Sequence, residues 1–351
     1  MATFSVNNIA IKGISCCVPK NRERNIDLDI LTQEEIQKFI DATGVVERRI
    51  ATKEICTSDL CCEAAEKLIK DLNWNKEEIE ILVFVSQTAD YILPVSAAIL
   101  QDRLGFSTNC IAFDVPLGCS GYVYGMSIVA GMMKATGLKK GLLLAGDTSS
   151  KLLSKSDKST VPLFGDGGSA TAFELDENAE SMLFDLGTDG SGFKTIIVND
   201  GGARNRTNSD SLTYHTISPG IERNACQLIL DGMDVFSFGI SQAPKTVNKL
   251  IENFEINKDT INHFVFHQAN LMMNKMIVKK LKLPVEKVPY SLKEFGNTSS
   301  TTIPLTIVTE LKEDLTNETR DLILCGFGVG LSWGTVKIRL DNVVISDLIE
   351  I

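Results

Sequence analysis

Five short apolar runs recur along the 351-residue chain, and longer segments with helical spacing of apolar residues separate them. The runs are continuous rather than alternating, which is typical of strands that helices cover on both faces of a mostly parallel sheet. They are residues 81–85, 110–115, 142–145, 263–266 and 322–325. Strand-like runs that alternate with amphipathic segments predict an α/β fold.

The order of these runs repeats in the two halves of the chain. Each half is predicted to read helix, buried strand, polar loop, strand, glycine-flanked polar turn, helix, buried strand and glycine-rich turn. Ser86 in the first half corresponds to His267 in the second, and Cys119 corresponds to Asn297 at a similar spacing. We interpret this repetition as an internal duplication. Two pseudo-symmetric halves would bring Cys119 and the polar loops of the second half to a shared centre.

The best surface break between the halves is the acidic segment 174–182, which predicts two units, 1–177 and 178–351. A glycine-rich stretch at 185–205 is predicted to leave the compact core. Long excursions of this kind in compact domains are often functional.

Composition narrows the class of protein. The net charge of −10 argues against a general binder of nucleic acid or of anionic membranes. The first residues do not resemble a signal peptide, and no apolar run approaches the 18 residues of a membrane span. Nine cysteines, an odd number with no C-x-x-C pair, fit reduced thiols. We therefore expect a cytoplasmic protein.

Cys119 is the cysteine whose surroundings suggest chemistry. Gly118 precedes it, Gly121 follows, and the next residues have the apolar spacing of a helix. Small neighbours at a strand-to-helix turn let a substrate approach, as in nucleophile turns. The helix dipole and free amides at such a position are expected to favour the thiolate and lower its pKa. The alternative is a small packing residue, the common role of free cysteine.

The chain has three histidines, His215, His263 and His267. His267 follows a predicted strand and opens the polar loop His-Gln-Ala-Asn, where ligands of open α/β sheets bind. His263 is expected to be structural, and His215 to lie in an exposed loop. The spacing of His263 and His267 lacks the H-E-x-x-H context of a zinc site, so no metal is predicted.

Two polar turns of the second half could serve the same site. Asn297 either presents its amide to a carbonyl oxygen or caps the helix that follows it. The glycines of 326–334 do not fit a dinucleotide fingerprint, because a strand-like segment follows them. We expect a tight turn there whose amides line an oxyanion hole. The similar turn at 164–170 is more simply structural.

A basic stripe is predicted on the helix at 271–283, where Lys275, Lys279 and Lys282 share one face. Such a stripe is commonly a solvated surface. On a net-negative chain, and beside the loop at 267–270, it could instead dock an acidic partner.

Taken together, these residues resemble β-ketoacyl-acyl-carrier-protein synthase III of the thiolase-like superfamily. The resemblance spans essentially the whole chain and rests on seven segments in order: 45–50, 113–125, 164–167, 231–236, 267–270, 296–300 and 326–334. It implies the five-layer αβαβα thiolase fold, a homodimer, and a catalytic triad of Cys119, His267 and Asn297.

The implied reaction is a decarboxylating Claisen condensation that starts fatty acid synthesis or a related pathway. Cys119 takes an acyl group from a primer thioester, while amides of Cys119 and of the turn at Gly328 and Val329 hold the oxyanion. A malonyl thioester on acyl carrier protein then loses carbon dioxide. Donors from His267 Nε2 and Asn297 stabilise the enolate that attacks the acyl group. No cofactor is implied; coenzyme A and carrier-protein thioesters are the substrates.

The resemblance also implies binding positions, several of which depart from the family pattern. The usual aromatic residue on the coenzyme A adenine falls at Lys38 and a nearby arginine at Ala42, so we expect weak use of acyl-CoA. Leu93 replaces the phenylalanine that the partner subunit usually offers to the acyl pocket. The expected carrier-protein or coenzyme A contacts are Gln268, Ala269, Asn270, Leu271, Met272, Lys158, Lys275 and Lys279.

Three other functions remain open from the sequence. The first is an acyltransferase of a specialised cluster that passes the acyl group from Cys119 to an amine or hydroxyl acceptor. The second is a condensing enzyme that works without decarboxylation, like hydroxymethylglutaryl-coenzyme A synthase. The third is a non-enzymatic partner scaffold, which the intact triad disfavours.

Overall fold

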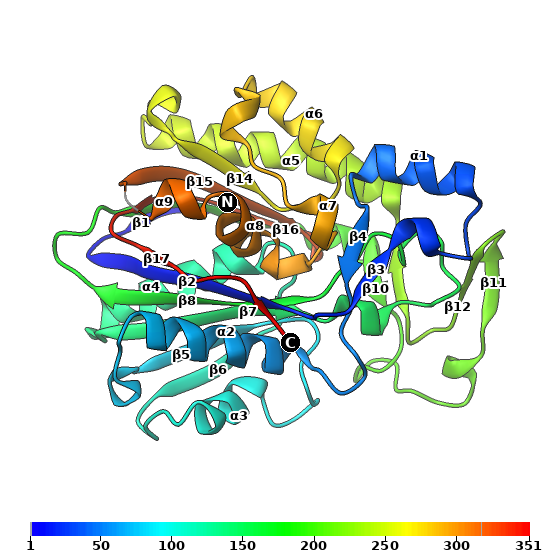
Figure 1. Ribbon diagram of the computed structural model, residues 1–351, viewed down its shortest axis with the longest axis horizontal. Coiled ribbons are helices and arrows are strands. Elements are labelled where there is room, and N and C mark those ends of the chain that lie inside the picture. The colour runs from blue at the N-terminus through cyan, green and yellow to red at the C-terminus, as the bar shows by residue number, and fades with distance from the viewer. Residues whose placement is uncertain (1, 317) are drawn as a thin grey trace.

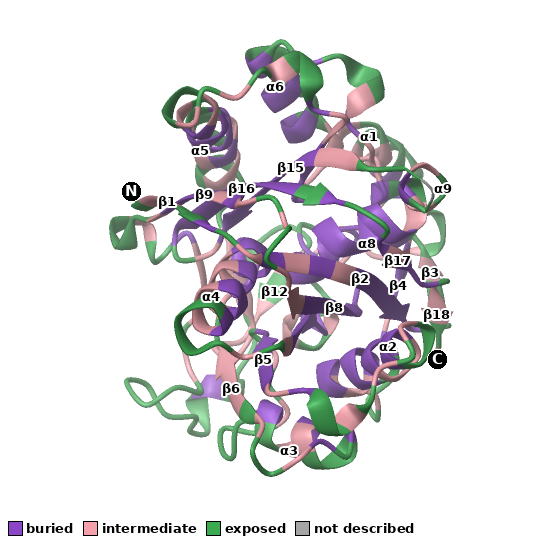
Figure 2. Ribbon diagram, turned by 90° about the vertical axis from the view of Figure 1, so that its left-hand side faces the viewer, coloured by how far each residue is buried: buried purple, intermediate pink, exposed green. Residues whose placement is uncertain are grey.

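Two β-sheets alternate with three layers of helices in the computed structural model, which describes residues 2–316 and 318–351 (Figure 1). In the view of Figure 2, helices α5 and α6 cover one sheet, α4 and α8 lie between the sheets, and α2 and α3 cover the other sheet. This is the expected five-layer αβαβα arrangement. Among the described residues, no helix has both the length and the apolar character needed to cross a membrane.

The described strands form two large sheets. The first contains, in spatial order, β17 (Val344–Ile345), β2 (Ile9–Val18), β8 (Gly167–Leu175), β7 (Lys140–Asp147), β5 (Ile81–Val85) and β6 (Ile111–Val115), and β18 (Ile349–Glu350) also pairs with β2. The second contains β1 (Ala2–Val6), β9 (Met182–Thr188), β16 (Ser332–Leu340), β15 (Arg320–Gly328) and β14 (His263–Phe266). A small pair joins β3 (Arg22–Arg24) to β4 (Glu47–Arg49).

The helices complete the layers. Their bounds are α1 (Gln33–Thr43), α2 (Thr57–Asp71), α3 (Ser96–Arg103), α4 (Gly121–Thr136), α5 (Gly232–Asn253), α6 (Leu271–Leu281), α7 (Leu292–Phe295), α8 (Thr302–Glu310) and α9 (Lys312–Leu315). Local signals explain several ends. A capping box between Thr32 and Glu35 starts α1, and Gly137, in the left-handed conformation, ends α4.

The prediction of mostly parallel sheets is wrong. Strand β5 pairs in parallel with β6 and β7, and β14 pairs in parallel with β15. Several other pairs are antiparallel: β2 with β8, β8 with β7, β1 with β9, β9 with β16, and β16 with β15. Helix layers cover both faces of the sheets, so an antiparallel strand is also apolar throughout. The continuous apolar pattern therefore reports the layer in which a strand lies, not its direction.

The repetition between halves is visible in the sheets. The order β5, β7, β8, β2 in one sheet has the same relative directions as β14, β15, β16, β9 in the other. The strand expected before Asn297 is absent from the described structure, because the short helix α7 stands where β6 stands in the first half. The sheets also exchange terminal strands, since β1 pairs with β9 and β17 pairs with β2. The division into 1–177 and 178–351 stays a prediction.

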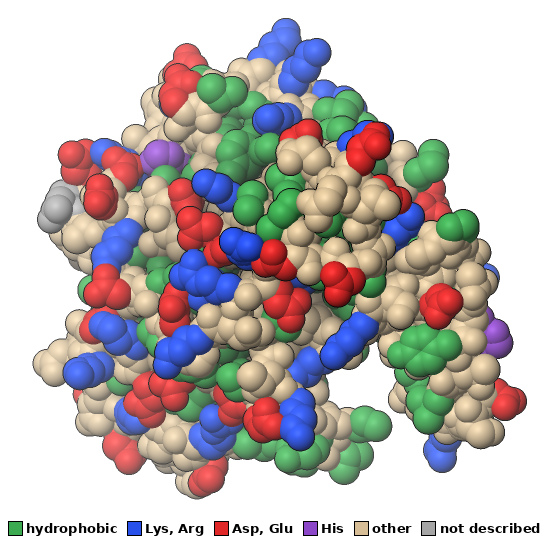
Figure 3. Space-filling model, turned by 45° about the vertical axis from the view of Figure 1, so that its right-hand side comes forward, with side chains coloured by type: hydrophobic (Ala, Val, Ile, Leu, Met, Phe, Trp, Pro, Cys, Tyr) green, Lys and Arg blue, Asp and Glu red, His purple; other side chains and the backbone are tan. Residues whose placement is uncertain are grey.

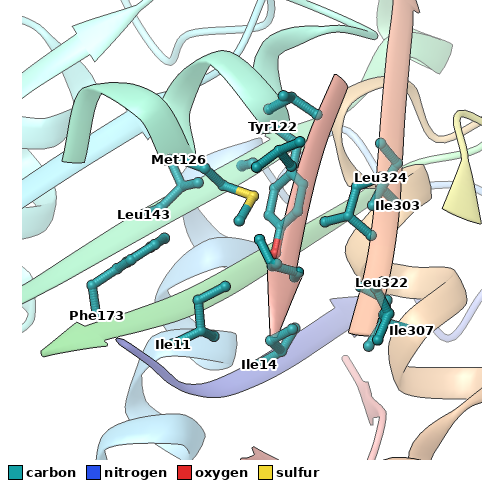
Figure 4. Packing of buried hydrophobic residues seen from close by; sticks show 14 of the residues in the cluster. Ile11, Ile14, Tyr122, Met126, Leu143, Phe173, Ile303, Ile307, Leu322 and Leu324 are labelled. Atoms are coloured by element: carbon teal, nitrogen blue, oxygen red, sulfur yellow. The ribbon is translucent and has the colours of Figure 1, made fainter. Parts of the chain in front are cut away.

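The largest core cluster lies around the middle helices (Figure 4). Tyr122 and Met126 of α4 pack among buried residues of both sheets, and Ile303 and Ile307 of α8 lie in the same cluster. The Tyr122 hydroxyl, fully buried, contacts the hydroxyl of Thr171 at 2.9 Å. This packing fixes the N-terminal ends of α4 and α8, beside which the predicted catalytic residues lie.

The segment that leaves the layers, called the excursion, is longer than the predicted 185–205 and begins later. Residues 185–188 belong to β9, and the chain then leaves the layers until α5 begins at Gly232. The excursion carries the pairs β10 (Ile196–Val198) with β13 (Leu228–Leu230), and β11 (His215–Ser218) with β12 (Ile221–Arg223). In Figure 3 the arm with β11 and β12, at the right, stands away from the body across a hollow.

Candidate active site

Cys119, His267 and Asn297 line one cavity of about 210 Å³. Cys119 lies just before α4, His267 directly after β14, and Asn297 in the turn before α8. The three side chains come from segments that are far apart in the sequence. The shared centre expected from the two halves is therefore present in the fold.

The turn before α4 is built around close backbone contacts. A side chain at Gly328 would place its Cβ 2.7 Å from the Cys119 Cβ and 2.8 Å from its sulfur, so only glycine fits there. The following turn is held by the Ser332 hydroxyl, which donates to the Val329 carbonyl at 2.8 Å and contacts the Ser120 hydroxyl at 2.7 Å. The start of α4 and the glycine-rich turn are thus joined as one unit.

The expectation that the Cys119 pKa is lowered is wrong. Burial, together with the negative charge of Asp147, raises the pKa of the thiol to about 12. Ser299 and the amides of Val329 and of Cys119 itself favour the thiolate and lower the pKa, but they do not offset the loss of water. Cys119 therefore rests as a neutral thiol that must lose a proton before it attacks.

These same two amides are the predicted oxyanion donors. Both lie close enough to the Cys119 sulfur to favour a negative charge on it, and Gly328 and Val329 line the cavity beside it. A carbonyl carbon bonded to that sulfur would hold its oxygen within reach of two N–H groups. This geometry suits a tetrahedral oxyanion, whose charge such donors stabilise.

His267 is buried, and its ring is held on two sides. The ring packs edge-on against Phe327 with centroids 5.6 Å apart, and Nδ1 lies 2.7 Å from the Thr302 hydroxyl. Burial lowers the pKa of His267 to about 3, so the imidazole is neutral. A neutral ring carries one proton. If Thr302 donates to Nδ1, Nε2 keeps that proton; if Thr302 donates to the Ser299 carbonyl, at 2.9 Å, Nδ1 carries it.

The helix-cap role considered for Asn297 is wrong, because Thr301 is the N-cap residue of α8 and no side chain caps that end. The Asn297 side-chain oxygen accepts a hydrogen bond from the Ser299 amide at 2.9 Å, a contact within the turn. The backbone amide of Asn297 donates to the Leu163 carbonyl at 2.9 Å, which fixes the turn against the first half. The side-chain oxygen is thereby occupied by the protein, and the NH₂ group is left as a donor for a ligand in the cavity.

Sequence reasoning missed several residues of the cavity. Asp147, at the end of β7, and Ser299, in the turn after Asn297, both line it. Part of its apolar wall comes from the excursion, at Ile196, Leu228 and Leu230, and other apolar lining residues include Leu152, Leu163 and Val235. Asp147 directly follows a predicted buried strand, which is a signal that could have identified it. The excursion residues carry no comparable signal, because only the fold brings them over the site.

Apart from Lys158, the predicted carrier-binding positions divide into three groups. Ala269 and Asn270 line the cavity, and the Asn270 side chain caps α6 by accepting from the Met273 amide at 2.8 Å. A shallow groove beside it is lined by Asp41, Leu271, Met272, Lys275, Met276 and Lys279. Gln268 is fully buried and donates to the Phe266 carbonyl at 2.7 Å, so its burial contradicts the expected contact with a carrier.

Lys158 and Leu93 lie outside the cavity wall of this chain. Lys158 pairs with Glu35 at 2.8 Å, and its aliphatic stem lies against Gly220 of the excursion arm. Leu93 is 79% exposed on the loop that precedes α3. His263 pairs with Asp314 at 2.7 Å, and His215, expected in a loop, is exposed on β11 instead.

Comparison with known proteins places the chain in one family. The family model for 3-oxoacyl-[acyl-carrier-protein] synthase III matches residues 113–190, and the model for the C-terminal part of that enzyme matches 251–340. The β-ketoacyl-[acyl-carrier-protein] synthase III of Fusobacterium nucleatum is 30% identical over 95% of this chain and 99% of its own length.

Solved structures agree. A 3-oxoacyl-(acyl-carrier protein) synthase from Burkholderia xenovorans LB400 is 36% identical, with a TM-score of 0.94 over 100% of this chain and 99% of that one. The 3-oxoacyl-(acyl carrier protein) synthase III of Pseudomonas aeruginosa PAO1 is 28% identical, with a TM-score of 0.83 over 96% of this chain and 100% of that one. The thiolase-like fold and the resemblance predicted from the motifs are confirmed. The chain belongs to the 3-oxoacyl-[acyl-carrier-protein] synthase III family.

Proposed function

We propose that the chain catalyses the decarboxylating Claisen condensation of an acyl thioester primer with malonyl-acyl-carrier-protein, which gives β-ketoacyl-acyl-carrier-protein. The observation that carries the proposal is the single cavity shared by Cys119, His267 and Asn297. A nucleophile and two separate polar groups in one cavity suit two successive reactions on thioesters.

In the first half-reaction, Cys119 attacks the primer carbonyl and becomes acylated. The amides of Cys119 and Val329 stabilise the oxyanion, because both lie close enough to the sulfur to favour a negative charge there. The apolar wall from the excursion accommodates the acyl chain. The reaction uses thioester substrates and the chain's own groups.

In the second half-reaction, the malonyl thioester loses carbon dioxide and its carbanion attacks the acyl group on Cys119. The free NH₂ group of Asn297 donates to the thioester oxygen as it becomes an enolate. His267 joins it through Nε2, in the arrangement where Thr302 donates to Nδ1. A neutral imidazole suits this role because it donates without adding a proton to the enolate.

The carrier protein docks, in this proposal, on α6. Lys275 and Lys279 line a groove with the half-exposed Met272, next to the cavity wall at Asn270. Acidic side chains of a carrier would pair with the lysines while an apolar side chain covers Met272. The positive charge would raise the association rate more than the affinity.

The primer is donated by a carrier protein in preference to coenzyme A. Lys38 is exposed and paired with Glu34 at 2.7 Å, so α1 offers no aromatic platform for an adenine there. Lys158 is already paired with Glu35 and is not free for a phosphate. Loss of a stacking platform costs roughly 1–3 kcal/mol, on the scale of base–aromatic stacking.

The working unit is a homodimer in the cytoplasm. Strand β6 is the partly exposed edge of its sheet, and large apolar side chains are exposed nearby, at Tyr91, Ile92, Leu93, Val95 and Ile111. A second copy pairing with this edge would cover them. The nine cysteines are free, as expected where thiols are kept reduced.

Intact-mass measurement of the acyl-enzyme tests the proposal. Matched acyl-CoA and acyl-carrier donors at equal concentration should both load Cys119, the carrier donor faster, and Cys119→Ala should abolish the mass shift. Loading on another cysteine would refute the assignment. Faster loading from acyl-CoA that Lys38→Trp does not improve would refute the donor preference. Acyl transfer to an amine or hydroxyl acceptor without release of carbon dioxide would replace the condensation with acyltransferase activity.

A further inference from the structure

The neutral thiol of Cys119 needs a proton acceptor during acylation. His267 is poorly suited to that task, because its ring nitrogen contact runs to Thr302 and burial holds its pKa at about 3. The leaving thiol of the primer must also receive a proton before it departs. One group that takes the proton and later returns it would serve both needs.

Ser299 lies between Cys119 and a buried carboxylate. Its hydroxyl is 4.0 Å from the Cys119 sulfur, and the same side chain lies close enough to Asp147 to lower the pKa of that carboxyl. A hydroxyl can accept from the thiol while it donates to the carboxylate. Both Ser299 and Asp147 line the cavity beside Cys119.

Asp147 is a buried acid that the condensation chemistry described above does not use. Its side chain is about as buried as a core residue, at 1% exposure, yet it lines the cavity. Its oxygens accept from the Gln87 amide at 2.8 Å and from the Ser300 hydroxyl and amide at 2.8 and 3.2 Å. The Ser86 hydroxyl adds a contact at 3.3 Å. These partners donate hydrogen bonds to the Asp147 oxygens, which indicates that Asp147 is an ionised carboxylate in the resting site.

The titratable groups near Asp147 include two thiols, since its charge acts on Cys119 at the start of α4 and on Cys61 of α2. His267 lines the same cavity. Burial raises the pKa of Asp147, while its hydrogen bonds lower it. A carboxylate whose pKa is raised is a stronger base than an exposed one.

We propose that Ser299 and Asp147 form a proton relay for Cys119 during acylation. The thiol proton passes to the Ser299 oxygen as the Ser299 hydroxyl proton passes to Asp147. The sulfur then bonds to the primer carbonyl carbon. When the carbon–sulfur bond of the primer breaks, the proton returns from Asp147 through Ser299 to the leaving thiolate. The inference rests on the proposed function, in that Cys119 is the acylated group.

The relay divides the site by half-reaction. Cys119, Ser299 and Asp147 serve acylation, and His267 with Asn297 serves the decarboxylation. Ser299 joins the two groups, since its amide also holds the Asn297 side chain. Replacing only the Ser299 side chain spares that backbone contact, which makes Ser299→Ala a selective change.

The relay is tested in single-turnover acylation of Cys119, followed by intact mass from pH 6 to 9, with Ser299→Ala and Asp147→Asn. Ser291→Ala is the matched control, because it removes a buried hydroxyl that pairs with Thr306 instead. We expect acylation at pH 7 to fall about 10²-fold in both variants, the usual size of a general-base contribution. The wild-type and control rates should level off with rising pH, whereas the variant rates should keep rising about tenfold per pH unit, because hydroxide takes the proton.

Release of carbon dioxide from malonyl-carrier protein by pre-acylated Ser299→Ala should fall far less than the acylation rate of the same variant. Wild-type acylation rates in Ser299→Ala would overturn the relay. Equal losses in both half-reactions with an unchanged pH profile would also overturn it, since they indicate structural damage. Failure of the wild-type enzyme to acylate Cys119 would instead refute the proposed function.

Discussion

At Cys119 the start of a helix and the loss of water act on the thiol pKa in opposite directions. A helix N-terminus contributes typically 0.3–1 kcal/mol in favour of a negative charge, and up to about 2 kcal/mol when partly buried. Raising the pKa from 9.0 to about 12 corresponds to about 4 kcal/mol. Burial therefore outweighs the dipole. The sequence shows the helix start but not the depth of the sulfur, which is why the direction was mispredicted.

Thr302 is a positioning residue for His267. Its hydroxyl lies 2.7 Å from Nδ1, so the direction of its hydrogen bond affects whether Nε2 carries a proton. Thr302→Val, which keeps the shape of the side chain, should lower carbon dioxide release about tenfold while Cys119 acylation stays within about twofold. The measurement is the two half-reaction rates side by side. An unchanged decarboxylation rate would show that Thr302 does not set the ring proton.

His267 also makes the fold sensitive to acid. Its pKa is about 3 in the folded protein against 6.5 for an ordinary histidine, so the unfolded chain binds the proton more readily between these values. The contribution of neutral His267 to the free energy of unfolding is therefore complete above pH 6.5 and is lost progressively as pH falls toward 3. Between pH 7 and 5, the melting temperature of His267→Gln should fall less than that of wild type. The exposed His215→Gln should behave as wild type. Equal falls of the melting temperature in all three proteins would show that His267 is not the cause of the acid sensitivity.

At the scale of elements, the site is made by helix starts that the core holds in place. Helices α4 and α8 are packed between the two sheets, so the turns at Cys119 and Asn297 are fixed by residues such as Tyr122 and Ile303. Helix α6 differs, because one side is buried at Met273 and Ile277 and the other faces solvent. A partner can therefore reach α6 but not the buried N-terminal ends of α4 and α8.

Charge reversal on α6 tests its role in docking. Lys275→Glu with Lys279→Glu should raise the Michaelis constant for malonyl-carrier protein about tenfold or more at low salt, with kcat little changed. The effect should shrink at high salt, because exposed charges are screened. Lys134→Glu with Lys139→Glu, one exposed lysine in the last turn of α4 and one just after the helix, is the charge-matched control. An equal rise of the Michaelis constant in the control would show that the effect comes from overall charge rather than from docking on α6.

At the scale of the molecule, β6 and the loop before α3 leave apolar surface uncovered in a single chain. Leu93→Asp places a charge in the proposed interface, where burying it unpaired is costly. We expect the variant to shift from dimer toward monomer in sedimentation at micromolar concentration, with acylation of Cys119 reduced. An unchanged dimer would mean that the subunits associate through another surface.

The layers and the convergence of the three main residues could be predicted from the sequence, because buried strands and glycine-flanked turns leave a local pattern. Strand direction could not, since burial on both faces makes parallel and antiparallel strands look alike. The duplication predicts a strand before Asn297, but the two halves differ there, because the short helix α7 takes the place of that strand. The part of the cavity wall formed by Ile196 and Leu228 could not be predicted, because the position of these side chains depends on how the excursion folds back over the site.

The most direct test follows one acyl group through both half-reactions on the same protein. The enzyme is loaded with a short acyl-carrier primer, the mass of acyl-Cys119 is recorded, and malonyl-carrier protein is then added in a single turnover. The account predicts that the acyl mass disappears from Cys119 as one carbon dioxide and one β-ketoacyl-carrier product form per site. An acyl group that stays on Cys119, or leaves it without carbon dioxide and a lengthened product, would contradict the account.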